Sequence, residues 1–162
     1  MADAATTDAL TIRLLQPADA LELSELLADY ITETRRGAPR RPDRLYVEKL
    51  LSKAQVEALG AQMGEDLIGF AMFFDLPEVV TGRRMGQVDE LFVCMRHRRQ
   101  GIATALLHAL EEEGRRRGWG EVRWTAPYGS FSGKAWSERR GIPARGETYQ
   151  LVLRPEDPMR DD

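Results

Sequence analysis

The stretch that decides the fold is VDELFVCMRHRRQGIAT, residues 88–104. It begins as an apolar strand that carries Asp89 and Glu90, continues into a basic loop at residues 96–99, and reaches Gly101 at the start of a helical pattern. The first N–H groups of a helix lack intrahelical partners and carry partial positive charge, so a helix start binds anions, and glycine lets a ligand approach the backbone. The stretch therefore predicts a diphosphate site. A solvated basic loop that caps an ordinary helix is the alternative interpretation.

Two other nucleotide-binding patterns and the metal-binding patterns are missing from the sequence. No Gly-Lys-Ser/Thr follows Gly101, and no Gly-x-Gly-x-x-Gly occurs anywhere in the chain. Cys94 is the only cysteine, and the two histidines, His97 and His108, lack metal-ligand spacing. We therefore expect neither a P-loop nor a dinucleotide fold, no disulfide and no bound metal.

Composition describes a water-soluble chain with room for one core. The 162 residues suit one ordinary domain, and 43% apolar with 30% charged residues is typical of a globular protein. The formal charge of −3 gives no overall positive field, so nucleic acid is not an expected partner, although arginines at 35–41, 96–99 and 115–117 leave that function as an alternative. The polar N-terminus does not resemble a signal peptide, and no apolar run is long enough for a membrane span. We expect a cytoplasmic protein without membrane contact.

Hydrophobic periodicity outside residues 88–104 predicts alternating strands and helices. Upstream, we expect a strand at 11–16, an amphipathic helix from Pro17, a short helix from Asp43, a hairpin of 55–63 with 67–74, and a break at 75–86. Downstream, we expect a helix at 101–117, a strand at 121–126, a short helix at 133–140 and a closing strand at 147–154. This order predicts a single α/β domain at 11–154 with a mixed central sheet flanked by helices. Residues 1–10 and 155–162 are expected to be tails, the first of them flexible.

Two motifs in this frame resemble one family. Arg98-x-x-Gly101-x-Ala103 matches the R/Q-x-x-G-x-G/A signature of the GNAT superfamily of N-acetyltransferases, and it follows an acid-containing strand and opens an amphipathic helix. Further on, residues 135–142 (AWSERRGI) resemble the "FYEKLGF" helix and turn of that family. The diagnostic motifs lie within 88–142, and the resemblance of fold covers about 11–154. It implies the GNAT fold and a reaction that uses acetyl-CoA.

The resemblance also implies how the coenzyme would be held. Main-chain N–H groups near residues 99–104 would wrap the diphosphate, and the end of the strand would separate from its neighbour and pair with the pantetheine arm. An N–H near Val93 would polarise the thioester carbonyl, as an oxyanion-hole donor does. Ser130 stands where relatives often carry Asn. The coenzyme-binding candidates are Leu91, Phe92, Val93, Cys94, Arg98, Arg99, Gln100, Gly101, Ile102, Ala103, Thr104 and Ser130.

An acceptor amine needs a base, and the strand offers two candidates. An alkylammonium has a pKa of about 10 and becomes a nucleophile only after losing its proton. Neighbouring residues on a regular strand face opposite ways, so only one of Asp89 and Glu90 can face the acceptor. In relatives that resemble polyamine acetyltransferases, an acid on this strand is the base. We favour Glu90 for its longer reach and keep Asp89 beside it. The alternative is that these acids are structural and pair with arginines.

The residue that protonates the leaving thiolate is less clear from the sequence. Many relatives have a tyrosine at the position of Ser137, and a serine hydroxyl is a much weaker acid than a phenol. Tyr128 could replace it, or could be a loop aromatic without a role. Cys94 could form an acyl-cysteine, but we interpret it as a small buried residue.

These residues favour an acetyltransferase that acts on a primary amine of a small molecule. Arginines between the first two expected helices, at positions 35, 36, 40 and 41, favour an acceptor with a carboxylate or phosphonate. The alternatives are acetylation of a polyamine or a protein amine, and a catalytically weak acyl-CoA-binding or regulatory domain. A homodimer is kept as a candidate assembly.

Overall fold

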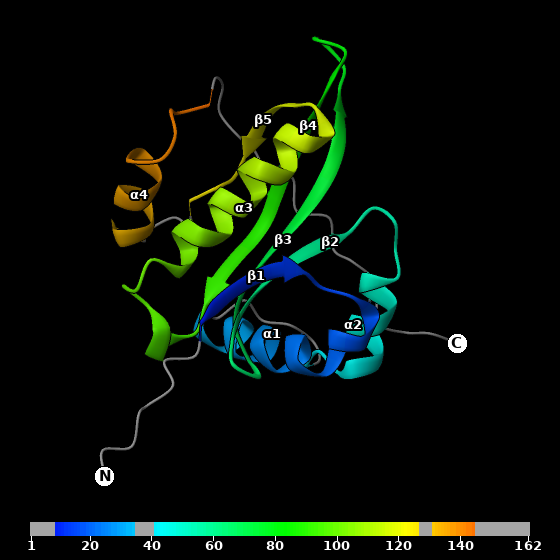
Figure 1. Ribbon diagram of the computed structural model, residues 1–162, viewed down its shortest axis with the longest axis vertical. Helices are drawn as coiled ribbons and strands as arrows, with labels where there is room; N and C mark the ends of the chain where they lie inside the picture. Colours follow the sequence, from blue (N-terminus) through cyan, green and yellow to red (C-terminus); the bar gives the residue numbers. More distant parts are fainter. Residues whose placement is uncertain (1–8, 35–40, 127–130, 145–162) are drawn as a thin grey trace, which may run out of the picture. The chain divides into compact units, whose positions relative to one another are not determined.

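The computed structural model of the protein describes residues 9–34, 41–126 and 131–144, and the contacts within the chain divide it into two units, residues 1–125 and 126–162 (Figure 1). The first unit contains β1 Leu10–Leu14, α1 Ala20–Thr34, α2 Arg44–Leu51, β2 Glu57–Met63, β3 Asp66–Glu78, β4 Arg83–Val93, α3 Ile102–Arg117 and β5 Trp119–Arg123. Short 3-10 turns lie at Pro17–Asp19 and Met95–His97. The second unit contains α4 Phe131–Glu138.

The strands form one mixed sheet in the order β1-β2-β3-β4-β5. The pairs β1–β2, β2–β3 and β3–β4 are antiparallel, while β5 runs parallel to β4 after the crossover through α3. A parallel neighbour requires such a crossover, and a helix is its usual form. The prediction of an α/β fold with a mixed sheet flanked by helices is confirmed.

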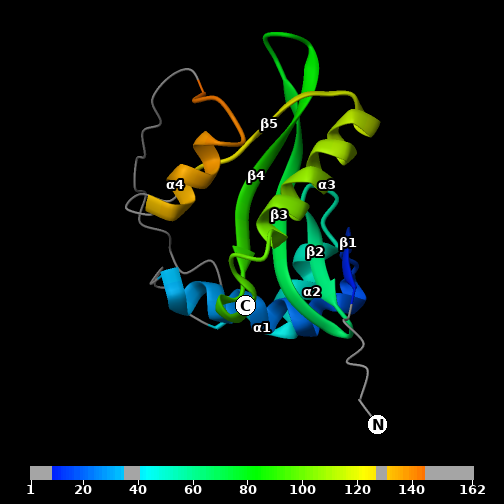
Figure 2. The same ribbon diagram turned by 60° about the vertical axis from the view of Figure 1, so that its left-hand side comes forward.

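The helices cover the sheet with their apolar stripes. Figures 1 and 2 show α1 beside α2 and α3 lying along the sheet. Tyr30 of α1 packs on Phe70, whereas Trp119, which follows α3, packs on Phe73. Side chains three positions apart on a strand lie on opposite faces, so α1 and the end of α3 occupy different faces of the sheet. The buried members of the stripes are Leu23, Leu26, Leu27 and Tyr30 on α1, Val47 on α2, and Ile102, Leu106 and Leu110 on α3.

The break expected at residues 75–86 is wrong, because β3 and β4 continue through it as a long hairpin. Pairing runs from Asp75↔Gly86 to Glu78↔Arg83, and the hairpin projects beyond the other strands in both views (Figures 1 and 2). Its turn is held by the Glu78 carboxylate, which accepts the N–H groups of Val80 and Thr81. Proline, glycine and charges in this segment suggested a break, since a hairpin beyond the core has no alternating apolar face to reveal it.

Other boundaries differ by a few residues from those expected. Strand β1 already begins at Leu10, inside the expected N-terminal tail, and β5 spans Trp119–Arg123 in place of 121–126. Helix α4 spans Phe131–Glu138 in place of 133–140. The closing strand expected at 147–154 and the C-terminal tail lie outside the described residues. Within the described part of the chain, no helix combines the length and apolar character needed to cross a bilayer.

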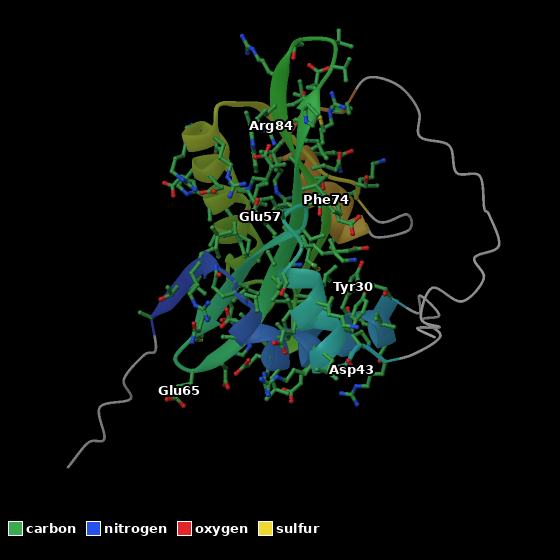
Figure 3. All side chains as sticks on the ribbon, turned by 90° about the vertical axis from the view of Figure 1, so that its right-hand side faces the viewer. Tyr30, Asp43, Glu57, Glu65, Phe74 and Arg84 are labelled. Atoms are coloured by element: carbon green, nitrogen blue, oxygen red, sulfur yellow. The ribbon has the colours of Figure 1, made fainter. Side chains whose placement is uncertain are left out.

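A charged network and a packed indole fix the junction of α3 and β5. Arg117 donates to both carboxylate oxygens of Glu57, at 2.5 and 2.6 Å, and also to Glu113 (Figure 3 labels Glu57). The hydrogen bond with Glu57 is the main reason that the pKa of Arg117 is raised. The Trp119 indole donates to Asp75 at 2.9 Å and covers Gly86 so closely that a Cβ there would overlap the ring. These contacts set where the crossover ends.

Candidate coenzyme and acceptor site

Strand β4 loses one of its two neighbours halfway along its length. Its pairing with β5 ends at Gln87↔Arg123, whereas its pairing with β3 continues to Gly69↔Val93. Among the described residues, the second half of β4 therefore has no strand on its β5 side. An extended ligand could pair with such an edge as an added strand does.

The main chain of Val93 lies on this unpaired edge. The N–H of Cys94 donates to the carbonyl of Ile68 on β3, at 3.0 Å. Successive peptide groups of a strand point to alternate sides, so the N–H and carbonyl of Val93 point away from β3. In agreement, the Val93 carbonyl accepts a hydrogen bond of 2.8 Å from Nε of Arg98. The edge thus presents an N–H at the position that the sequence predicted for polarising a carbonyl.

A β-bulge separates the two candidate bases. Met72 pairs with Glu90 and Phe73 pairs with Val88, which leaves Asp89 as the extra residue of β4. Such a bulge interrupts the alternation of a strand, so the expectation of opposite faces, which assumed a regular strand, no longer holds. Asp89 is exposed, and Glu90 is half-buried. Burial distinguishes the two acids where simple alternation does not.

Glu90 is held from helix α1. The Tyr30 hydroxyl donates a hydrogen bond to Oε2 of Glu90. The Tyr30 ring packs edge-on against Phe70 and Phe92, with ring centroids 6.1 and 5.4 Å away. Figure 3 shows the position of Tyr30. The sequence placed Tyr30 only in an apolar stripe, but a buried phenol usually has a hydrogen-bond partner, and that signal could have indicated its role.

The start of helix α3 at Gly101 has the properties of an anion-binding site. Gly101 caps α3 with φ 84° and ψ 0°, and Arg99 also has a positive φ, of 64°. A Cβ built on Gly101 would meet no atom within 4 Å, so space lies open beside this backbone. The side chain of Ile102 is buried in the core, which leaves its main chain as the part that could contact a ligand. Residues 99–104 therefore combine an open approach with the positive end of a 16-residue helix.

Arg98 is already engaged by the protein. Besides its bond to the Val93 carbonyl, its guanidinium lies 2.6 Å from a carboxylate oxygen of Glu33 on α1 and over the ring of Phe92, 5.4 Å from the centroid. The side chain of the first motif residue thus joins the loop to β4 and α1. Its role in binding the coenzyme stays a prediction.

Most of the other residues predicted to bind the coenzyme have buried or half-buried side chains, so a ligand would contact mainly their main chain. Phe92, Val93 and Cys94 are buried, and Leu91 is half-buried. The Cys94 sulfur lies 3.1 Å from Nδ1 of His97, inside the short turn that leads into the loop. The Gln100 amide donates to the carbonyl of Arg96 at 3.3 Å. Ala103 and Thr104 lie in the first turn of α3 and are half-buried.

The two residues predicted as acids, Tyr128 and Ser137, and the coenzyme candidate Ser130 all belong to the second unit. Tyr128 and Ser130 lie outside the described residues. Ser137 belongs to α4 in the second unit, where its carbonyl accepts the N–H groups of Arg140 and Gly141 at 3.0 and 2.9 Å. The site on the first unit consists of Glu90, the Val93 edge and residues 98–104, and the source of a proton for the leaving thiolate stays a prediction.

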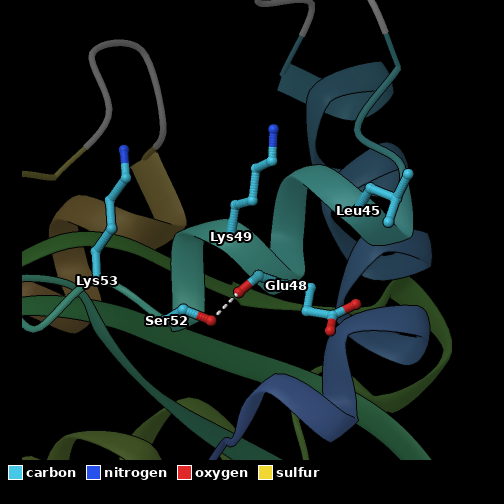
Figure 4. A pocket seen from close by; sticks show the side chains of 5 residues that line it. All are labelled: Leu45, Glu48, Lys49, Ser52 and Lys53. Carbon is cyan, nitrogen blue, oxygen red and sulfur yellow. Dashed lines mark hydrogen bonds between the residues drawn. The ribbon is translucent and has the colours of Figure 1, made fainter.

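A separate open hollow lies along α2 (Figure 4). It shares no residue with the site on β4, and the hydroxyl of Ser52 in it donates to the Glu48 carbonyl at 2.7 Å. The lining residues are Leu45, Glu48, Lys49, Ser52 and Lys53. Among the described residues, no group of three or more His, Cys, Asp or Glu side chains could hold a metal ion.

Comparison with known proteins agrees with this geometry. The sequence profile of the Acetyltransferase (GNAT) family matches residues 22–131. A ribosomal-protein-alanine N-acetyltransferase from Brucella melitensis biovar Abortus 2308 is 39% identical, with 90% of this chain and 99% of that chain covered and a TM-score of 0.79. An aminoglycoside acetyltransferase from an uncultured soil metagenomic sample is 24% identical, with 90% and 99% covered and a TM-score of 0.77, and at this identity shows the fold alone. Among curated proteins, none matches the sequence.

Proposed function

The chain belongs to the GNAT acetyltransferase family, and we propose that it transfers the acetyl group of acetyl-CoA to a primary amine with Glu90 as the base. One observation supports the proposal most. A single strand, β4, presents a half-buried carboxylate and a main-chain edge that no strand of the described part of the chain pairs with, and it leads into the open start of α3. A base, a carbonyl-polarising donor and an anion site thus follow one another along the chain.

The coenzyme roles follow from these main-chain groups. We assign the diphosphate to the N–H groups of residues 99–104 and the thioester carbonyl to the N–H of Val93. A donor of this kind is stronger against the oxyanion that develops during acyl transfer than against the neutral carbonyl, and can be worth about 3 kcal/mol. The anion site binds the coenzyme, and the Val93 donor lowers the barrier.

The carboxylate of Glu90 would take the proton of the attacking amine, directly or through a water molecule. The Tyr30 hydroxyl donates to Oε2 of this carboxylate. Base catalysis of this kind contributes about 10²–10⁴-fold to turnover. Glu90→Gln keeps the shape of the side chain and removes its basicity, so it tests the role directly.

Two classes of acceptor deserve comparison. The relative with 39% identity is named for acetylating the alanine of a ribosomal protein, which favours the α-amine of a protein N-terminus. An α-amine has a pKa of about 8, well below that of an alkylammonium, so it needs less help from a base. The arginines at 35–41 favour a small amine that carries a carboxylate or phosphonate; of these, Arg41 is described and is exposed. A homodimer and a cytoplasmic location stay predictions.

A test begins with purified protein and acetyl-CoA. At 100 times its dissociation constant, acetyl-CoA should stabilise the fold by about 2.7 kcal/mol, which a melting curve detects. Release of free thiol is then followed with a peptide that begins with alanine, the same peptide with a blocked N-terminus, and a panel of small amines. Turnover of only the peptide with the free N-terminus would identify a protein acceptor. Binding without turnover of any amine would favour the alternative of an acyl-CoA-binding or regulatory domain.

A further inference from the structure

Tyr30 connects helix α1 to the strand that carries the proposed base. We propose that Tyr30 is a positioning residue, whose hydroxyl orients the Glu90 carboxylate toward the acceptor amine. The inference rests on the proposed function, because it assigns Tyr30 a role only through Glu90. Its evidence is a buried phenol that donates to one carboxylate oxygen and a ring fixed by two aromatic neighbours.

The ring of Tyr30 has little freedom to move. Its exposed fraction is 8%, and it packs edge-on against Phe70 and Phe92, which face each other across β3 and β4. Edge-on aromatic pairs are directional and stabilise the orientation of the rings beyond the effect of their buried area. These contacts therefore fix the position of the hydroxyl over β4.

Glu90 needs such a fixed partner more than a residue on a regular strand would. It follows the bulge at Asp89, where the local pairing of β4 is interrupted. A glutamate side chain also has several rotatable bonds, so holding it in one orientation costs entropy at every catalytic cycle unless the protein has already fixed it. A hydrogen bond from a buried phenol supplies that fixation.

Several elements surround the Glu90 carboxylate. On the face shared by Glu90 and Phe92, α1 contributes Tyr30 and, one turn later, Glu33, while the loop after β4 contributes Arg98. Strand β3 places the uncharged Met72 opposite Glu90, and β4 adds the exposed Asp89. A hydrogen bond to a charged group is stronger than one between neutral groups. Removing the Tyr30 hydroxyl should therefore loosen the Glu90 carboxylate and lower kcat.

Tyr30→Phe isolates the hydroxyl, because the phenyl ring keeps the contacts with Phe70 and Phe92. We expect kcat to fall about tenfold, the size expected for losing one hydrogen bond to a charged group, while KM for acetyl-CoA stays unchanged. Tyr46→Phe is the matched control, since Tyr46 lies on α2 with 41% of its surface exposed, and it should leave both constants unaltered. An unchanged kcat in Tyr30→Phe, or an equal loss in Tyr46→Phe, would overturn the proposal.

A double-mutant cycle separates this inference from the proposed function. If Tyr30 acts through Glu90, adding Tyr30→Phe to Glu90→Gln should cause no further loss of kcat. If Glu90→Gln alone leaves kcat unchanged, the proposed base is wrong and the role of Tyr30 falls with it. If Glu90→Gln lowers kcat but Tyr30→Phe does not, only the positioning role is wrong. Should Tyr30→Phe fail to fold, 3-fluorotyrosine at position 30 keeps the ring and changes only the strength of the hydroxyl as a donor, and kcat should then change; an unchanged kcat would contradict the proposal.

Discussion

Nη2 of Arg98 lies 2.6 Å from a carboxylate oxygen of Glu33, so the first residue of the Arg-x-x-Gly-x-Ala motif is joined to helix α1. The same guanidinium donates from Nε to the carbonyl of Val93. Two of the guanidinium nitrogens, Nε and Nη2, therefore contact the protein. The negative charge of Glu33 partly neutralises the positive charge of Arg98. We therefore predict that Arg98 acts on the coenzyme site mainly by holding the loop against β4 and α1.

Substitutions at the two partners should reveal this role. We expect Arg98→Gln and Glu33→Gln to weaken acetyl-CoA by a similar factor of about 5, the scale of one partly exposed charged contact, because each releases the same anchor. Titration calorimetry with acetyl-CoA measures the change. If the Arg98 guanidinium instead bound a phosphate directly, removing the competing carboxylate would tighten binding. A higher affinity in Glu33→Gln would therefore contradict the anchoring role.

Gly101→Asp should abolish acetyl-CoA binding without unfolding the protein. The aspartate would fill the open space at the start of α3 and place a negative charge where the diphosphate is expected. Gly82→Asp is a matched control, since Gly82 also has a positive φ, of 69°, and open space around its Cβ position, but lies in the β3–β4 turn. Both variants carry a left-handed residue at a cost of about 1–2 kcal/mol. If Gly101→Asp bound acetyl-CoA normally, residues 98–104 would be only a helix cap.

The order of elements could be predicted from the sequence because each carries its own local signal. The stripe of Leu23, Leu26 and Leu27 has helical spacing, and Gly101 and Gly118 punctuate α3 at its two ends. The outer part of the long β3–β4 hairpin could not be predicted from the sequence. Beyond the core its strands face water on both sides, and they lose the alternation of apolar and polar residues. A sequence signal of this kind reports burial, and it fails where a strand is stabilised by pairing alone.

Within the site, local motifs were predictable and contacts between distant segments were not. The helix start at Gly101 follows from spacing in one short stretch. The contacts of Tyr30 with Glu90 and of Arg117 with Glu57 each join residues 60 positions apart, so no local pattern announces them. The bulge at Asp89 likewise depends on how β4 pairs with β3, and it undermined an argument from alternation that was sound for a regular strand.

Gly86→Ala should destabilise the fold through packing alone. A Cβ at this position would overlap the Trp119 ring. Gly114 also contacts this ring, and a Cβ there would lie 2.8 Å from it. The indole cannot move far, since it donates to Asp75 and packs on Phe73. Overpacking of this kind typically costs about 1–3 kcal/mol. Urea unfolding measures the loss, and Gly114→Ala should reproduce a smaller part of it; an unchanged midpoint for Gly86→Ala would show that the ring can relocate freely.

Ser137→Tyr should raise turnover. A phenol at this position is the donor that many relatives resembling this chain use to protonate the leaving thiolate, and serine is too weak an acid to do so. Steady-state kcat with the best acceptor checks the prediction, and Ser132→Tyr on the same helix is a control for adding a ring to α4. An unchanged kcat would indicate that another donor, such as Tyr128 or an ordered water, already serves.

The network around Arg117 should make the fold sensitive to acid. Burial alone would raise the pKa of Asp75, but hydrogen bonds from Arg84, Trp119 and Arg117 outweigh it and lower that pKa. The pKa of Glu113 is also lowered, first by its hydrogen bond with Arg116 and then by that with Arg117. A carboxyl whose pKa is lower in the folded state contributes stability that is present above its ordinary pKa of about 4 and is lost as the pH falls below it, because the unfolded chain takes up the proton first.

We therefore expect the free energy of unfolding to be level from about pH 7 to 5 and to fall steeply below about pH 4.5. Arg117→Met should lower stability at pH 7 and flatten this acid limb, since it removes the cation shared by Glu57, Glu113 and Asp75. Arg116→Met is the matched control, because Arg116 neighbours it on α3 but has 67% of its side chain exposed, so water and salt screen its ion pair with Glu113. Urea unfolding of the three proteins at a series of pH values makes the comparison. Equal losses in the two variants at pH 7, with parallel acid limbs, would show that Arg117 holds the junction of α3 and β5 by packing over Phe73 and Trp119 and not by charge.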